Sequence, residues 1–357
     1  MAAAFAPLAP HAERPMRVVV LDDDPVFRVV LSRMLKNIGL DVAATCADIT
    51  SAQRRVSRGD IDAVTVDVVL RGESGLDFLK WCRATHPSTL NVLVTAGSER
   101  GARTGIDGVL LGAAALLTKP DAARLPGFEN ELKRVFSDGH GKKPARALVP
   151  PSGPALRRAH RRDLLAIGAS TGGPPALLKL LKGLPTWFDA PVVITQHMPS
   201  EHLKHFAELL SSQTPRLVTL VSGTMTLERG KTYLAGAERH LQVLRQPNGA
   251  LAGRPLDTPP EHHCRPAVDP MFASVAQACA GTALGVVLTG MGSDGAKGAL
   301  QLRERGNPVL VQDEASSVVW GMPGSVMSAG AADAVIAIER MPTSILEWME
   351  WTSRGNP

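Results

Sequence analysis

The sequence predicts two α/β domains with mainly parallel sheets, joined by a linker. The chain has 357 residues, 44% of them hydrophobic, which is enough for two cores of ordinary size. Short apolar runs alternate with helix-length segments in both halves. A stretch with four prolines and little apolar periodicity separates the halves. The predicted boundaries are a disordered tail at 1–15, domains at 16–136 and 163–350, and a basic linker at 137–162.

The first domain is expected to have strands at residues 17–24, 62–70, 91–97 and 115–120, with a fifth near 42–45. In such a sheet the site lies beyond the carboxyl ends of the strands. The four main runs end in reactive side chains, namely Asp22, Asp23 and Asp24, then Asp67, Thr95, and Lys119. Carboxylates that converge on one edge repel one another unless a cation lies among them, and Mg²⁺ suits this edge. A lysine and a hydroxyl across from it would bind a phosphoryl group carried on Asp67.

The second domain is expected to have strands at 163–170, 191–198, 217–223, 231–236, 283–292 and 307–314. The first of them runs into a glycine-rich turn that satisfies G-x-S-x-G around Ser170. A phosphate-binding loop is the alternative, but Pro174 and Pro175 stand where its lysine and hydroxyl residue would be. A serine at this place projects into the cleft, beside the N–H groups of a helix start. The turn therefore predicts a nucleophile.

The nucleophile needs a base, and His197 is the best placed histidine because it ends the next strand. Adjacent parallel strands bring their carboxyl ends side by side. His202 and His205 are expected on a helical face, and His262 and His263 lie in a proline-rich stretch. A structural or surface role is the alternative for any single histidine.

A second glycine-rich turn supplies Asp294 as the carboxylate that would orient the base. Its alternative role is to cap a helix that begins at Ala296. The order serine, histidine, aspartate differs from the serine, acid, histidine order of α/β-hydrolases. The chain is therefore not expected to have that fold.

Residues 16–136 resemble the receiver domain of two-component response regulators, which has a flavodoxin-like fold. The resemblance implies that Asp67 is the phosphoacceptor, that Asp22 and Asp23 help to hold Mg²⁺, and that Thr95 and Lys119 contact the phosphoryl group. Arg71 and Ser74 stand where the family usually has a proline and an aspartate. We expect a looser loop there, with an effect on phosphorylation kinetics.

Nearly the whole chain resembles the chemotaxis response regulator protein-glutamate methylesterases. The motifs that carry this resemblance are AIGASTGG, ITQHMP, HHCRPAVDPMF, LTGMGSDGAKGA and QDEASSVVWGMPGSV. It implies a triad of Ser170, His197 and Asp294, with Thr171 and the Met291 backbone supporting the oxyanion. It further implies methyl ester hydrolysis and glutamine deamidation without a cofactor in the esterase site. In YLAGAERHL, Gly236 and Ala237 replace the usual proline and glycine, and a local loop change is expected.

The same resemblance implies methyl-accepting chemoreceptors as substrates and the chemotaxis histidine kinase as phosphodonor. The receiver would cover the esterase cleft until Asp67 is phosphorylated. A DNA-binding output is disfavoured because residues 163–357 carry a net charge of −2, while the linker carries +6. No nucleic acid partner is expected. A non-catalytic binding output remains an alternative, which predicts loss of a triad residue, and none is lost.

We expect the protein to be located in the cytoplasm and not to insert into a membrane. No apolar run approaches the roughly 20 residues of a membrane helix, and the start lacks a secretory pattern. The spacing of the four cysteines, Cys46, Cys82, Cys264 and Cys279, indicates free thiols. The first strand follows Met16 directly, so Met16 rather than Met1 is the expected start. The particular receptors, the behaviour controlled and the oligomeric state are not encoded in recognisable motifs.

Overall fold

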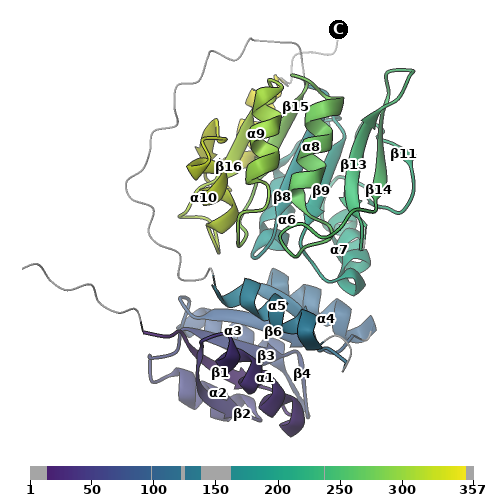
Figure 1. Ribbon diagram of the computed structural model, residues 1–357. Coiled ribbons are helices and arrows are strands. Elements are labelled where there is room, and N and C mark those ends of the chain that lie inside the picture. The colour runs from purple at the N-terminus through teal and green to yellow at the C-terminus, as the bar shows by residue number, and fades with distance from the viewer. Residues whose placement is uncertain (1–13, 98, 122–124, 138–161, 237, 351–357) are drawn as a thin grey trace, which may run out of the picture.

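The N-terminal domain is built on a five-stranded parallel sheet of order β2-β1-β3-β6-β7 (Figure 1). The computed structural model describes residues 14–97, 99–121, 125–137, 162–236 and 238–350. The strands are β1 (Arg17–Leu21), β2 (Asp41–Cys46), β3 (Ala63–Asp67), β6 (Leu90–Thr95) and β7 (Ala115–Thr118). All five predicted strands of this domain are therefore present. Most of the predicted linker, the predicted tail up to residue 13, and Ala237 lie outside the described residues.

Four helices connect these strands, α1 (Pro25–Asn37), α2 (Ile49–Val56), α3 (Gly75–Thr85) and α4 (Glu99–Leu110), and α5 (Leu125–Ser137) follows β7. Helix α1 begins where it does because Asp24 accepts hydrogen bonds from the Val26 and Phe27 amides. A small hairpin, β4 (Val69–Leu70) with β5 (Glu73–Ser74), follows β3. Ser74 then caps α3 by accepting from the Leu76 amide, a role that serine and aspartate share.

The C-terminal domain has a seven-stranded parallel sheet of order β10-β12-β9-β8-β15-β16-β17. Its strands are β8 (Leu164–Ala169), β9 (Val192–Gln196), β10 (Val218–Val221), β12 (Thr232–Ala235), β15 (Ala283–Val287), β16 (Val309–Gln312) and β17 (Ala334–Ile336). Its helices are α6 (Gly173–Gly183), α7 (Ser200–Gln213), α8 (Val268–Ala278), α9 (Ala296–Glu304), α10 (Gly321–Ser328) and α11 (Met341–Trp348). The six predicted strands are confirmed, and β17 is an addition at the edge.

A separate antiparallel sheet of order β11-β14-β13 was not predicted. It consists of β11 (Met225–Thr226), β13 (His240–Arg245) and β14 (Leu251–Leu256). Gly253 and Pro255 lie within β14 and weaken the sequence signal of a strand. The sheet lies beside α8, and its residues share an apolar cluster with that helix.

The two domains meet through helices α4 and α5 of the first domain (Figure 1). Helix α4 packs against α6 and α7. One cluster of buried apolar residues is continuous across the boundary, from Ile106 and Val109 to Ala176 and Leu203. The Gly172 amide donates a hydrogen bond to the Ala114 carbonyl at 2.9 Å. The first domain therefore lies on the carboxyl edge of the second sheet. Within the described residues, no helix combines the length and apolar character needed to span a bilayer.

Candidate active site

The acidic edge of the N-terminal domain brings three predicted carboxylates together. Asp22 and Asp23 follow β1, and Asp67 ends β3, so neighbouring parallel strands deliver them to one point. Ligand oxygens of the three lie within 4.8 Å of one another. The Lys119 ammonium lies 2.7 Å from Asp22 Oδ2 and 2.7 Å from Asp67 Oδ2. Lys119 thereby balances part of the negative charge at this edge.

The chemistry of this edge fits Mg²⁺ and a phosphoryl group. Burial raises the pKa of Asp22 against the opposing pull of Lys119, because a charged carboxylate is poorly solvated there. Thr95 is 1% exposed, and its Oγ1 has no hydrogen-bond partner among the described residues. Because β6 pairs with β3, Thr95 ends the strand next to Asp67. A phosphoryl oxygen is the kind of partner that this hydroxyl lacks.

The loop after Asp67 lies close to the acceptor. A Cβ at Gly75 would lie 1.9 Å from the Asp67 carbonyl oxygen, so a larger residue cannot replace this glycine without displacing the backbone. Arg71, the residue in the usual proline position, has its Nε 3.3 Å from Asp23 Oδ2. Because its side chain is 85% exposed, this ion pair is a weak one.

Three neighbouring strands of the second sheet position the predicted triad. Ser170 follows β8, His197 follows β9 and Asp294 follows β15, and β8 lies between the other two. The β8–β9 pairing is parallel and in register, as predicted. The His197 amide donates to the Ala169 carbonyl at 3.0 Å, and the Ser170 amide donates to the Thr289 carbonyl at 3.1 Å. The carboxyl ends of all three strands therefore meet at one place.

His197 and Asp294 are in direct contact. His197 Nε2 lies 2.8 Å from Asp294 Oδ2, so Nδ1 is the imidazole nitrogen that does not contact Asp294. The Asp294 carboxylate is 1% exposed and also accepts from the Val268 and Asp269 amides, at 2.6 and 2.9 Å. Burial alone would raise the pKa of Asp294, but His197 and these amides hold it below its ordinary value. Asp294 is therefore held as an anion.

The alternative role of Asp294 as the cap of the next helix is wrong. Helix α9 begins at Ala296 after Gly295, which has φ +92° and makes no side-chain cap bond. The carboxylate turns away from α9 and holds the first turn of α8. Sequence reasoning missed this because α8 begins 26 residues earlier in the chain than Asp294.

The Ser170 turn is shaped by close approach to the second glycine-rich turn. A Cβ at Gly290 would lie 2.8 Å from the Ser170 Cβ, so glycine is required for the two turns to meet. Thr289 Oγ1 donates to the Thr171 carbonyl at 3.0 Å and fixes the turn. Thr171 and Met291 both line the same pocket as Ser170. No hydrogen bond joins Ser170 and His197 within the described part of the chain.

Gln196 is a site residue that the sequence did not reveal. Its side chain is 1% exposed, and Nε2 donates to the carbonyls of Ser170 and His197, each at 2.9 Å. A single side chain thus ties the backbone at the serine to the backbone at the histidine. Its position directly before His197 was the only available signal, and such a signal does not distinguish it from an ordinary strand residue.

The remaining histidines have other contacts. His202, predicted to lie on a helical face, is buried at the domain boundary, where its Nε2 lies 3.2 Å from Thr118 Oγ1. His205 pairs with Glu208 in the same helix. His262 contacts Asp269 rather than the Ser170 turn.

Cys264 links the base to the N-terminal domain. It is 5% exposed, and the Arg134 guanidinium of α5 donates to its Sγ at 2.6 Å. Burial alone would raise the pKa of the Cys264 thiol, but His197 and Arg134 bring it below its ordinary value. Burial likewise opposes protonation of His197, yet Cys264 and Asp294 raise the pKa of its imidazole. Arg134 is the group of the first domain that takes part in this arrangement.

Both domains contribute to one pocket of about 680 Å³. The second domain lines it with the triad, Thr171 and Met291, and the first domain with Thr118, Lys119 and Arg134. A protein substrate has to reach Ser170 through a space that the first domain partly fills. The present arrangement, called the closed state below, therefore restricts access to the serine.

A second group of possible metal ligands consists of His262, Asp269 and Asp294. Their oxygens, however, already accept hydrogen bonds from His197, from His262 and from backbone amides. A cation there would have to displace these donors. The donor set fits a hydrogen-bonded network better than a metal centre.

The fold and the two sites define a class of protein: a response regulator whose output domain has the side chains of a serine hydrolase. Residues 18–126 match the response regulator receiver domain, and residues 165–345 match the CheB methylesterase family. The chain belongs to the CheB methylesterase family, in the form with an N-terminal receiver domain.

Similar proteins share this organisation over their whole length. A protein-glutamate methylesterase/protein-glutamine glutaminase of Xanthomonas campestris pv. campestris is 37% identical, over 94% of this chain and 97% of that protein. One of Trichodesmium erythraeum is 33% identical, over 92% of this chain and 98% of that protein. The crystal structure of the Thermotoga maritima CheB methylesterase catalytic domain is 33% identical with a TM-score of 0.51, and covers 54% of this chain and 100% of that one.

Proposed function

We propose that this chain is a protein-glutamate methylesterase and glutaminase in which Ser170 is the nucleophile. Ser170 Oγ attacks the carbonyl of a glutamyl methyl ester while His197 Nδ1 takes its proton. His197 then gives the proton to the departing methanol, which leaves the glutamyl group bound to Ser170. Water attacks this acyl-enzyme while His197 takes its proton, and His197 then returns the proton to Ser170 Oγ as the glutamate leaves. A glutamine side chain would release ammonia in the same way. The 2.8 Å contact between His197 and Asp294, beside Ser170 at adjacent strand ends, is the observation that carries this proposal.

Asp294 orients the imidazole and stabilises its positive form when the proton is transferred. Thr171 and the Met291 backbone are proposed to support the oxyanion, because both line the pocket at the Ser170 turn. Loss of one oxyanion donor generally lowers kcat about 10²- to 10³-fold. No cofactor is proposed for the esterase chemistry.

Regulation is proposed to start at Asp67. Asp22, Asp23 and Asp67 would hold Mg²⁺, which neutralises the incoming phosphate, and Lys119 and Thr95 would bind the phosphoryl oxygens. The phosphoryl group would shift an equilibrium between the closed state and an open state. In the closed state the receiver restricts the pocket that contains Ser170. The phosphodonor is proposed to be a chemotaxis histidine kinase and the substrates methyl-accepting chemoreceptors, in the cytoplasm.

The test is methanol release from a methylated chemoreceptor and ammonia release from its unmodified glutamines. The full chain should catalyse both, and Ser170→Ala should abolish both while the protein stays folded. Ser212→Ala is the matched control, since Ser212 is exposed on α7 and its hydroxyl donates to the Leu209 carbonyl of the same helix. Retention of either activity by Ser170→Ala would show that another residue is the nucleophile.

A further inference from the structure

The carboxylate that orients the base is held by the start of another helix. Asp294 accepts hydrogen bonds from the amides of Val268 and Asp269, which are the first two residues of α8. A helix start favours an anion because its free N–H groups and its dipole point at the charge. The orientation of Asp294, and therefore of His197, depends on where α8 begins.

Asp269 fixes this helix start against α9. Its Oδ1 accepts from the Gly298 amide, in the first turn of α9, at 2.6 Å. Asp294, which is separated from α9 only by Gly295, holds α8 in turn. Each of the two buried carboxylates thus binds the start of one helix: Asp294 accepts from α8, and Asp269 accepts from α9. A Cβ at Gly298 would lie 2.9 Å from the Asp269 carbonyl oxygen, which shows how closely the helices approach.

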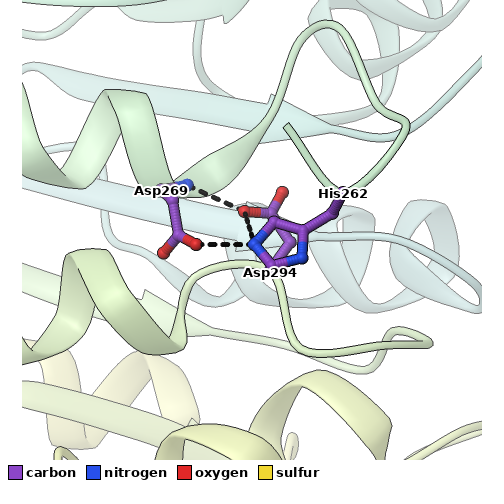
Figure 2. Close-up of side chains that lie close together, drawn as sticks. All are labelled: His262, Asp269 and Asp294. Carbon is purple, nitrogen blue, oxygen red and sulfur yellow. Dashed lines mark hydrogen bonds and ion pairs between the residues drawn. The ribbon is translucent and has the colours of Figure 1, made fainter. Parts of the chain in front are cut away.

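His262 stands between these two carboxylates (Figure 2). Its Nε2 lies 2.8 Å from Asp269 Oδ2 and 4.0 Å from Asp294 Oδ1. Asp269 and Asp294 are only 3% and 1% exposed, so each anion depends on protein donors for its solvation. Burial raises the pKa of Asp269, and the charge of Asp294 adds to this, while the Gly298 amide and His262 oppose it.

The backbone at His262 is strained. His262 has φ +51° and His263 has φ +58°, a conformation that residues other than glycine rarely adopt twice in succession. Such strain persists where surrounding contacts determine it, and it concentrates at functional sites. Here it directs the His262 imidazole onto Asp269.

We propose that His262 is a positioning residue, which donates its Nε2 hydrogen to Asp269 and thereby keeps the α8 start, Asp294 and His197 aligned for catalysis. It acts through Asp269 and does not touch the reacting atoms. The proposal rests on the proposed function for its catalytic consequence. Its geometric content can be measured in the full chain without any substrate.

The experiment compares His262→Ala and His262→Gln with His263→Ala as the matched control. Glutamine restores an N–H donor at similar reach, and His263 has the same side chain and the same backbone strain. Two quantities are measured: kcat and KM for methanol release, and the downfield ¹H resonance of the hydrogen bond between His197 and Asp294. For His262→Ala we expect kcat to fall about tenfold to hundredfold with KM nearly unchanged, as for other partners that orient a functional side chain. We also expect its resonance to shift or broaden.

For His262→Gln we expect kcat within a few-fold of wild type and an unchanged resonance, and for His263→Ala no change in either. An unchanged kcat and resonance in His262→Ala would overturn the proposal. A loss of kcat without any change in the resonance would do so too, because His262 would then act on the substrate. If His262→Ala fails to fold, loss of the resonance in His262→Gln contradicts the proposal, and its retention supports it. Absence of methanol release by the wild-type chain would contradict the proposed function and leave the resonance to decide the positioning role.

Discussion

Arg134→Ala should activate the unphosphorylated enzyme. The guanidinium of this α5 residue donates to Cys264 Sγ at 2.6 Å and to the His263 carbonyl at 3.5 Å. Both acceptors belong to the second domain, so the side chain connects the domains beside the catalytic histidine. The first contact is short and charge-assisted, and the second lies at the limit of a hydrogen bond.

The expected magnitude follows from these two contacts. Together they should stabilise the closed state by about 1–2 kcal/mol, which corresponds to roughly a 5- to 30-fold change in an equilibrium constant. The basal rate should rise by this factor, up to the limit set by the phosphorylated enzyme. The phosphorylated rate itself should not change, because the open state lacks the contacts.

The assay is methanol release from methylated chemoreceptor, with and without a small acyl phosphate as phosphodonor. Lys133→Ala is the matched control, because Lys133 precedes Arg134 in α5 and pairs with Glu129 of the same helix at 3.2 Å. The control should keep the wild-type basal rate. An Arg134→Ala basal rate equal to that of Lys133→Ala would refute the role of this contact in the closed state.

Three further outcomes are expected. Gln196→Leu removes the buried donor to the Ser170 and His197 carbonyls. It should lower kcat for methanol release about tenfold and lower the free energy of unfolding, measured by urea titration, by about 1–3 kcal/mol. An unchanged kcat would contradict this. Arg71→Ala should change the Mg²⁺ affinity of the receiver less than about threefold, because the ion pair between Arg71 and Asp23 is exposed. The affinity is measured by fluorescence titration, and a tenfold change would show that the ion pair is strong. Burial lowers the pKa of His202, so the closed state binds fewer protons than an open one. The stability of the closed state is present above the ordinary pKa of 6.5 and is lost as the pH falls below that value. Hydrogen exchange at the contact between α4 and α7 should therefore accelerate below pH 6.5 in wild type and not in His202→Gln.

The strands of both parallel sheets could be predicted because buried parallel strands are continuous apolar runs with reactive residues at their carboxyl ends. That rule alone brought Asp22, Asp67 and Lys119 together, and it placed His197 beside Ser170. These are contacts between neighbouring strands, which the order of the runs along the chain makes visible.

Contacts made by loops and by opposite ends of helices could not be predicted. Asp294 was expected to orient His197, with capping of its own helix as the alternative; that it also holds the start of α8 was not foreseen. Cys264 and His262 lie in a loop whose path no periodicity determines, although the segment HHCRPAVDPMF marked it as distinctive. Arg134 and Cys264 are 130 positions apart in the sequence, and nothing in the residues around either one indicates that they are in contact.

The coupling of Asp67 to Ser170 is tested most directly by the rate of methanol release from methylated chemoreceptor, measured on the full chain before and after addition of Mg²⁺ and a small acyl phosphate. We predict a clear rise in the wild-type chain, no rise in Asp67→Asn, and no release at all in Ser170→Ala. A wild-type rate that is the same with and without the phosphodonor would contradict the account.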